Sequence, residues 1–401
     1  MIKQIKNIAI LAASSLLLSA SFATNAGMLK LDGTVLPTIA AGNENDDSGA
    51  PLVPAGSFTG VVSIQIETDE GFFICTGSAI SKRHIITAAH CVEDSTTTGT
   101  VIDITSPGFS VTTIFTDGGV LDTFIGSESV DIHPDYKGFA VCGAGDVSGF
   151  FGQCLNDDIA VITLSEDIPD GIEIYDFARD TVIDSGTLFT MVGHGTTGNG
   201  YDGFTANSAD YFNKRFGFNI VEFFDCDDAT TDDISSGGFS SSQACGAFYG
   251  NQAEVWFADF DGYDSFLDLF DGTGDGFIDS FCQFFGVGCG TGLGDDLTAA
   301  LFEGAIGGGD SGGPSFIYDA LNDKFLLAAN NTFGTQGQGP FGIPGAFGEI
   351  FGGNLYAPYL DWIDTNFLLP LAARDVPAPA ALGLLTVALS LMALRRRKLT
   401  V

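Results

Sequence analysis

The amino-acid sequence predicts an all-β protein built from short strands. Runs of β-branched and other apolar residues recur along the chain, each bounded by Gly, Asp, Asn or Ser; clear examples are 60–66, 79–86, 159–164 and 325–329. Such runs, separated by turn residues, are typical of antiparallel sandwiches and barrels. Glycine makes up 54 of the 401 residues, roughly twice its usual share, which favours turns over long helices. Before the C-terminal tail, only residues 355–367 have a helical pattern.

Composition and charge exclude two broad classes of protein. The chain has 51 acidic residues against 15 Lys and Arg, which gives a formal net charge of −36. A nucleic-acid-binding protein needs clustered basic residues to contact phosphates, so that class is excluded. Hydrophobic residues make up 45% of the chain and include its 36 Phe. This is enough apolar material for a packed core, which excludes global disorder. The length allows one large domain or two ordinary ones.

Residues 1–26 have the three-part pattern of a secretory signal peptide. The stretch opens with two lysines, continues through an apolar run and ends in small residues. We expect cleavage after Ala23 or Ala26, which leaves residues 27–54 as an N-terminal segment of an exported protein.

Residues 370–401 contain a second targeting pattern. The sequence Val-Pro-Ala-Pro leads into an apolar run over 380–394, and the basic cluster 395–398 follows at once. The run is shorter than the roughly 20 residues that span a bilayer comfortably, but the basic cluster fits a tail that stays in the cytoplasm. The order resembles the PEP-CTERM sorting signals of Gram-negative bacteria, with Ala378 where Glu is commonest. The resemblance implies a temporary inner-membrane anchor that an exosortase-type enzyme removes; a permanent anchor is the alternative. Either way, we expect a secreted or cell-surface protein.

The eight cysteines favour disulfides over metal thiolates. Their number is even, the chain has export signals, and Cys-x-x-Cys does not occur. Their spacing alone leaves the pairing open, and they lie at positions 75, 91, 142, 154, 226, 245, 282 and 289.

Three separated fragments contain the residues with catalytic chemistry. The first is Thr-Ala-Ala-His-Cys ending at Cys91, the second is Asn-Asp-Asp-Ile-Ala-Val with Asp158 before an apolar run, and the third is Gly-Gly-Gly-Asp-Ser-Gly-Gly-Pro around Ser311. Peptide hydrolysis by a serine needs a base that takes the hydroxyl proton, an acid that orients the base, and N–H donors for the oxyanion. The three fragments supply all of these groups, in the chain order His, Asp, Ser.

With these motifs in this order, the chain resembles the trypsin-like serine proteases. The resemblance implies two antiparallel six-stranded β-barrels of chymotrypsin type with a short C-terminal helix, in a domain over residues 55–369. Barrel one would cover about 55–180 and barrel two about 181–369. Because the chain between Gly195 and Ser311 is longer than in compact relatives, we expect a long insertion in barrel two at about 200–300.

The resemblance also implies a role for each motif residue. His90 corresponds to the general base, Asp158 to the acid that fixes the imidazole tautomer, and Ser311 to the nucleophile. The amides of Gly309 and Ser311 correspond to the oxyanion hole. The family disulfide next to the base corresponds to Cys75 and Cys91.

Further family positions extend the likeness. Thr332 and Gly334 stand in the segment that pairs with the substrate backbone. We interpret the histidines in His-Pro-Asp-Tyr at 133–136 and Gly-His-Gly at 193–195 as structural. Residues 359–363 resemble the closing helix.

Two departures concern the substrate pocket. Ala305 stands where trypsin has the Asp that selects Arg and Lys, so the resemblance implies preference for an apolar or small side chain. Gly307 replaces a cysteine that braces the pocket in many relatives.

A third departure concerns activation. In the family a newly formed N-terminal amine pairs with the Asp before the nucleophile, here Asp310. The usual Ile-Val-Gly-Gly is absent, and Ile-Ala-Ala-Gly at 39–42 is a weak echo. A side chain or another terminus is the alternative partner of Asp310.

The acidic segment 271–282 approaches a calcium-binding loop, with Asp, Thr, Asp, Gly and Asp at relative positions 1, 3, 5, 6 and 9. Position 12 is Cys282 instead of Glu, so an acidic Gly-rich surface loop is the alternative. The hydrolytic chemistry itself requires no cofactor.

The sequence therefore predicts a secreted serine endopeptidase that acts on proteins or peptides and is not specific for Arg or Lys. The alternative is a cell-surface or matrix interaction protein that uses a protease scaffold, because a fold alone does not prove activity.

Overall fold

A computed structural model describes residues 40–41, 52–94, 97–144, 153–200, 202–226, 253–260, 262–263, 277–278, 303–335 and 343–371. The expected signal peptide lies outside these residues, as do the expected calcium loop apart from 277–278 and the C-terminal sorting segment from residue 372 onward. In the described ranges, no helix has the length and apolarity needed to cross a membrane.

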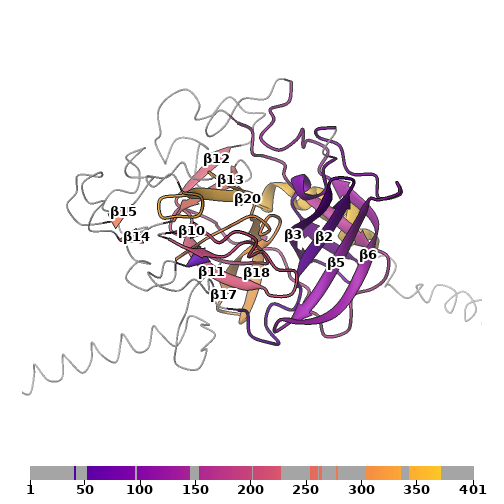
Figure 1. The fold of residues 1–401 in the computed structure, drawn as a ribbon, viewed down its shortest axis with the longest axis horizontal. Helices are drawn as coiled ribbons and strands as arrows, with labels where there is room; N and C mark the ends of the chain where they lie inside the picture. The colour runs from indigo at the N-terminus through magenta and orange to yellow at the C-terminus, as the bar shows by residue number, and fades with distance from the viewer. Residues whose placement is uncertain are drawn as a thin grey trace, which may run out of the picture. The chain divides into compact units, whose positions relative to one another are not determined.

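The first half of the chain forms a closed six-stranded barrel with the strand order β2-β3-β4-β7-β6-β5. All neighbouring strands are antiparallel. Figure 1 shows β2, β3, β5 and β6 side by side in indigo to magenta. The strands are β2 (Val61–Thr68), β3 (Gly71–Ala79), β4 (His84–Thr87), β5 (Ser110–Asp117), β6 (Val120–Ile132) and β7 (Ala160–Leu164).

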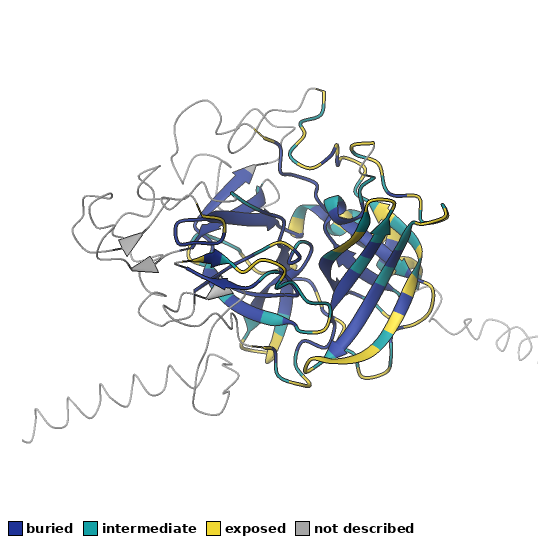
Figure 2. Ribbon diagram, in the orientation of Figure 1, coloured by how far each residue is buried: buried dark blue, intermediate teal, exposed yellow. Residues whose placement is uncertain are grey.

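The barrel interior is filled by alternate residues of these strands. On β2, for example, Val62, Ile64 and Ile66 point into one apolar core together with Phe115 of β5 and Ile162 of β7. The long strand β6 leaves many of its residues exposed, as Figure 2 shows on the outside of the barrel. Side chains therefore alternate between the barrel interior and the other face of each strand, and on β2 that other face is buried as well at Val61 and Ser63.

The second half consists of two four-stranded sheets, with the orders β11-β8-β17-β18 and β12-β13-β20-β19. Apolar residues of both sheets, such as Met191, Ile317, Trp256 and Phe351, belong to one core. The strands are β8 (Leu188–Gly193), β11 (Arg215–Ile220), β12 (Phe223–Cys226), β13 (Ala253–Asp259), β17 (Pro314–Asp319), β18 (Lys324–Asn330), β19 (Phe333–Gly334) and β20 (Ile350–Asn354). The expected all-β, chymotrypsin-type fold is confirmed.

Two smaller sheets complete the strands. One has the order β10-β9-β1-β16 and joins β1 (Ala40–Ala41) to β16 (Gly304–Ala305), with β9 (Gly198–Asn199) and β10 (Gly203–Phe204). The other pairs β14 (Gly262–Tyr263) with β15 (Phe277–Ile278).

Part of the expected insertion is barrel structure. The strands β11, β12 and β13 all fall within residues 200–300, yet they pair with β8 and β20 in the two main sheets. These three strands therefore belong to the main sheets.

The last described residues contain the short helix expected near the C-terminus. A 3-10 turn, η4 (Ala357–Tyr359), precedes α5 (Leu360–Ile363), which continues into the π-helical turn η5 (Asp364–Leu368). Within this C-terminal helical segment, the rings of Trp362 and Phe367 pack edge to face, with centroids 5.1 Å apart.

Two disulfides lie in the part of the chain that the structure describes. They join Cys75 to Cys91 and Cys142 to Cys154. Both are in the first half, and the first one crosses from β3 to the 3-10 turn η1 (Ala89–Val92) that follows β4.

Candidate active site

His90 lies on η1, immediately after the buried strand β4. The turn is anchored to the barrel core by the buried neighbours of His90, which are Ala89, Cys91 and Val92. The His90 side chain keeps 21% of its surface exposed. The turn therefore anchors itself with apolar residues and presents the imidazole toward solvent.

Asp158 is positioned by a tight turn at the start of β7. Asp157 before it has φ 62, a left-handed conformation that few non-glycine residues adopt, and Ile159 after it is wholly buried. The carboxylate of Asp158 is almost fully buried and engages His90 twice. Its Oδ1 accepts a hydrogen bond from the His90 backbone N–H at 2.7 Å, and its Oδ2 lies 2.6 Å from the ring Nδ1.

This pair sets the basicity of His90. Burial lowers the pKa of the imidazole, but the charge of Asp158, its hydrogen bond and the charge of Glu93 outweigh burial. The pKa of His90 is therefore raised above its usual value. The cause is stabilisation of the imidazolium, which is the state that a general base passes through.

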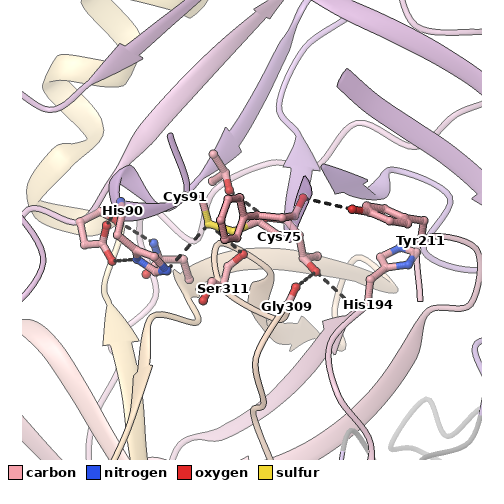
Figure 3. Close-up of a disulfide and its surroundings, with 12 residues drawn as sticks. Cys75, His90, Cys91, His194, Tyr211, Gly309 and Ser311 are labelled. Atoms are coloured by element: carbon pink, nitrogen blue, oxygen red, sulfur yellow. Dashed lines mark hydrogen bonds and ion pairs between the residues drawn. A yellow bond between two sulfur atoms is a disulfide. The ribbon is translucent and has the colours of Figure 1, made fainter. Parts of the chain in front are cut away.

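Ser311 comes from the second half of the chain and is held next to His90 by the backbone. Its carbonyl oxygen accepts a hydrogen bond from the Thr76 N–H at 2.9 Å. The sulfur of Cys91 lies 3.6 Å from that same carbonyl oxygen and 3.9 Å from His90 Nε2. Figure 3 shows His90, the disulfide and Ser311 side by side. Within the described residues, the Ser311 hydroxyl makes no hydrogen bond to His90, an arrangement common in enzymes without substrate.

The turn that carries Ser311 requires glycine on both sides. Gly309 has φ 102 and Gly312 has φ 77. A Cβ at Gly312 would lie 2.0 Å from Thr87 Oγ1, so no side chain fits there. The Gly309 carbonyl accepts a hydrogen bond from Thr76 Oγ1 at 2.8 Å. Neither the Gly309 nor the Ser311 amide donates a hydrogen bond among the described residues, so both are free to bind an oxyanion.

Asp310 lies beneath this turn, wholly buried. Its Oδ1 accepts the Gly195 N–H at 2.7 Å, and its Oδ2 accepts the Gly307 N–H at 2.9 Å. The carboxylate also explains Gly-His-Gly at 193–195. A Cβ at Gly193 would lie 2.0 Å from Asp310 Oδ1, and one at Gly195 would lie 2.4 Å from Asp310 Cγ. Burial raises the pKa of Asp310 to about 7, although the two N–H groups and Arg215 oppose that rise.

The expected pocket residues lie on two short strands. Ala305 on β16 is wholly buried and shares a core with Phe351 of β20. Gly334 on β19 pairs directly with Phe351. Thr332 is buried and donates from its Oγ1 to Asn330 Oδ1 at 3.1 Å. Ala305 and Phe351 therefore share an apolar environment, whereas the Glu349 carboxylate lies next to Gly334.

Several residues near the site had no recognisable signal in the sequence. Asn330 donates to the Asp158 carbonyl at 2.9 Å from 172 residues away. The ring of Phe139 packs on His90, with centroids 4.9 Å apart. Glu349, a buried acid next to Gly334, accepts a hydrogen bond from the Gly345 N–H. Only contacts formed in the folded chain identify these residues.

Two groups of side chains in the described ranges have the composition of a metal site. Cys75, His90 and Cys91 form the first, but both cysteines are consumed by their disulfide. The second is His133, Asp135 and Asp157, in which His133 Nδ1 lies 3.2 Å from Asp157 Oδ1. That ion pair ties the end of β6 to the turn before Asp158, in line with the expected structural role of His133. Of the calcium loop expected at 271–282, only residues 277–278 are among the described residues.

Comparison with known proteins supports the fold assignment. Residues 52–215 match the family model Trypsin. A solved structure titled as HL collagenase at 1.7 Å resolution shares 18% identity with this chain, with a TM-score of 0.40, and the alignment covers 79% of this chain and 96% of the other. No curated protein sequence matches the chain.

The fold is of chymotrypsin type, and residues 52–215 are similar to the Trypsin family. Within that fold the described site has His90, Asp158 and Ser311 together, which is the basis for its proposed chemistry.

Proposed function

We propose that the protein is a serine endopeptidase with His90 as general base, Asp158 as the orienting acid and Ser311 as nucleophile. One observation carries the proposal. The doubly bonded His90–Asp158 pair and the glycine-flanked Ser311 meet at the Cys75–Cys91 disulfide, although they come from opposite halves of the chain.

The geometry supports acyl transfer in two halves. Ser311 Oγ attacks the carbonyl carbon of the scissile peptide bond, and its proton passes to His90 Nε2. Asp158 holds the proton on Nδ1 through the 2.6 Å contact, so Nε2 has the free lone pair. The amides of Gly309 and Ser311 donate to the oxyanion. His90 then protonates the leaving amine, and water repeats the sequence to release the acid and restore Ser311.

The same proposal extends to substrate preference. Ala305 offers no charge and shares an apolar core with Phe351, the residue that pairs with Gly334. A cationic substrate side chain would be desolvated there without a partner from Ala305, whereas a small or apolar one would lose little. We therefore expect cleavage after small or apolar residues. Cleavage only after Arg or Lys in a peptide library would contradict this and would direct attention to Glu349.

The terminal segments remain part of the proposal. Residues 1–26 support export, and residues 370–401 support an inner-membrane anchor that an exosortase-type enzyme removes, with permanent anchoring as the alternative. Calcium at 271–282 is a separate proposal. A chelator that left thermal stability unchanged would contradict it.

Covalent labelling by a fluorophosphonate tests the proposed activity. The full chain should be labelled, Ser311→Ala should not, and the matched control Ser165→Ala, at an exposed serine, should behave as the parent. An unlabelled parent would contradict the proposal and favour the interaction protein built on a protease scaffold.

A further inference from the structure

The carboxylate of Asp310 is held by backbone amides alone. It is wholly buried, and it accepts one N–H from Gly195 and one from Gly307. No direct ion pair to it is formed by residues in the described ranges. A buried carboxylate keeps its charge only when hydrogen bonds or a cation offset the loss of water. An ionised Asp310 therefore needs a nearby positive charge in addition to these two hydrogen bonds.

Arg215 lies on the same face of the sheet as this carboxylate. It is the first residue of β11 and stands directly opposite Gly193 of β8 in the antiparallel ladder. Directly opposite residues point their side chains to the same face. At Gly193 that direction leads to Asp310, because a Cβ there would lie 2.0 Å from Asp310 Oδ1. The side chain of Arg215 therefore leaves β11 toward the carboxylate.

The guanidinium of Arg215 is available for this role. Its Nε and Nη1 are buried and have no hydrogen-bond partner among the described residues. Leaving such donors unpaired is costly, and an arginine cannot give up its charge to avoid the cost. Burial lowers the pKa of Arg215, while the charges of Asp210 and Asp310 raise it. Asp310 is thus one of two acids that act on this cation.

The neighbouring charged groups are engaged elsewhere. Asp210 accepts hydrogen bonds from the Phe212 N–H at 2.8 Å and from the Asn213 amide. The ammonium of Lys214 donates to the carbonyls of Phe58 and Val61 at 2.8 and 2.9 Å.

His194 supplies no charge either. Burial, followed by the charge of Lys214, lowers its pKa to about 3, so it stays neutral at ordinary pH. Of the three basic residues Lys214, His194 and Arg215, only Arg215 supplies a positive charge toward Asp310.

We propose that Arg215 is a positioning residue of the protease, whose guanidinium keeps Asp310 ionised and thereby holds the loop 307–311 in its active shape. The inference rests on the proposed function and adds the missing partner of Asp310. An ionised carboxylate accepts with both oxygens, which matches its bonds to Gly195 and Gly307. A protonated carboxyl presents an O–H to one of those N–H groups and loses that bond.

The loop links this charge to the reacting atoms. Asp310 lies in the loop between Gly307 and Ser311. Its carbonyl also accepts a hydrogen bond from the Gly313 N–H at 2.9 Å. The amides of Gly309 and Ser311 belong to the same turn. Loss of charge on Asp310 therefore disturbs both oxyanion donors without removing either residue.

A new N-terminus is the competing source of positive charge. The strand β1 pairs with β16, so that Ala40 lies opposite Ala305, five residues before Asp310. A cut before Ile39 would release an amine close to that strand. Arg215 instead supplies the charge within the uncut chain, so the two sources predict different results for a substitution at position 215.

The test compares Arg215→Met, Arg215→Lys and Asp310→Asn in the full chain, with the N-terminus of each purified sample sequenced. Fluorophosphonate titration gives the concentration of active sites, and hydrolysis of a peptide amide gives kcat and KM across neutral pH. We expect Arg215→Met to lose about fivefold in kcat at neutral pH, with little change in KM. A rise of about one unit from a pKa of about 7 lowers the ionised fraction of Asp310 from about one half to about one tenth. In the plot of kcat against pH, the fall in activity on the acid side should move to higher pH, because Asp310 then needs a higher pH to ionise. Arg215→Lys should restore most of kcat, since it returns the charge.

The double variant separates positioning from general damage. In the Asp310→Asn background there is no carboxylate to ionise, so Arg215→Met should cost no further kcat, whereas a purely structural role of Arg215 would add its loss. Parental kcat and an unshifted acid limb in Arg215→Met would overturn the inference, whichever N-terminus the sample carries. Fluorophosphonate labelling of the parent in the same series shows that such a result does not refute the proposed protease activity.

Discussion

Replacing Asp158 with Asn tests how the carboxylate controls His90. Both carboxylate oxygens of Asp158 contact His90. Oδ1 accepts a hydrogen bond from the His90 backbone N–H at 2.7 Å, and Oδ2 lies 2.6 Å from the ring Nδ1. Asparagine has only one oxygen. If that oxygen keeps the backbone N–H, the amide NH₂ faces Nδ1, which must then be an acceptor. The ring proton moves to Nε2, where it blocks the transfer from Ser311.

The magnitude follows from the loss of the reactive tautomer. Substitutions of this kind in the Ser-His-Asp template lower kcat by about 10⁴. This corresponds to a rise of about 5.4 kcal/mol in the activation free energy, at about 1.36 kcal/mol per factor of ten. The pKa of His90 should also fall, because burial continues to lower it while the Asp158 charge that raises it is gone. The acid limb of the residual activity should therefore move to lower pH.

The assay is hydrolysis of a peptide amide as a function of pH, with circular dichroism to verify folding. Asp170→Asn is the matched control, because Asp170 is an exposed acid whose ion pair with Lys82 lies at the surface. An Asp158→Asn variant that stays folded and retains kcat within about tenfold of the parent would refute the assigned role of Asp158.

Three further predictions concern the surroundings of the site. Replacing Cys75 and Cys91 together by Ala should lower the free energy of unfolding by about 3 kcal/mol, because the disulfide closes a loop with a sequence separation of 16; an unchanged midpoint in denaturant would contradict this. Gly195→Ala should lose at least about 100-fold in kcat/KM, since its Cβ would meet Asp310 Cγ at 2.4 Å and displace the loop of the oxyanion donors, so wild-type kinetics would show that the loop tolerates the shift. Glu93→Gln should move the acid limb of activity to lower pH with kcat on the plateau nearly unchanged, because the charge of Glu93 raises the pKa of the catalytic imidazole; an acid limb at the parental pH would rule out that influence.

The candidate catalytic residues stand out in the sequence because each lies in a local motif whose shape depends on its neighbours. Gly309 and Gly312 are present because their φ values exclude most side chains, so the turn around Ser311 is visible in the sequence itself. Asn330 and Arg215 left no such trace. The role of Asn330 depends on its hydrogen bond to the Asp158 carbonyl, and the role proposed for Arg215 depends on the pairing of β11 with β8. Both arrangements join residues that are distant in the sequence.

The extent of the insertion could not be predicted for a related physical reason. β11, β12 and β13 have ordinary strand sequences, and sequence distance from a motif does not show whether a strand pairs with the main sheets or lies outside them. The pairing of β13 with β20 joins residues 253–259 to residues 350–354. Such long-range pairing has no local signature, so a count of residues between Gly195 and Ser311 does not show which of them pair with the main sheets.

The central claim is that His90 and Ser311 act as one catalytic unit, and a double-mutant comparison of peptide-amide hydrolysis tests it most directly. The rates to measure are those of the parent, His90→Ala, Ser311→Ala and the double variant. Residues that act as a unit are strongly non-additive, so we predict that each single variant loses nearly all activity and that the double variant is no slower than either. Losses that multiply in the double variant would contradict a shared proton-transfer step and with it the proposed mechanism.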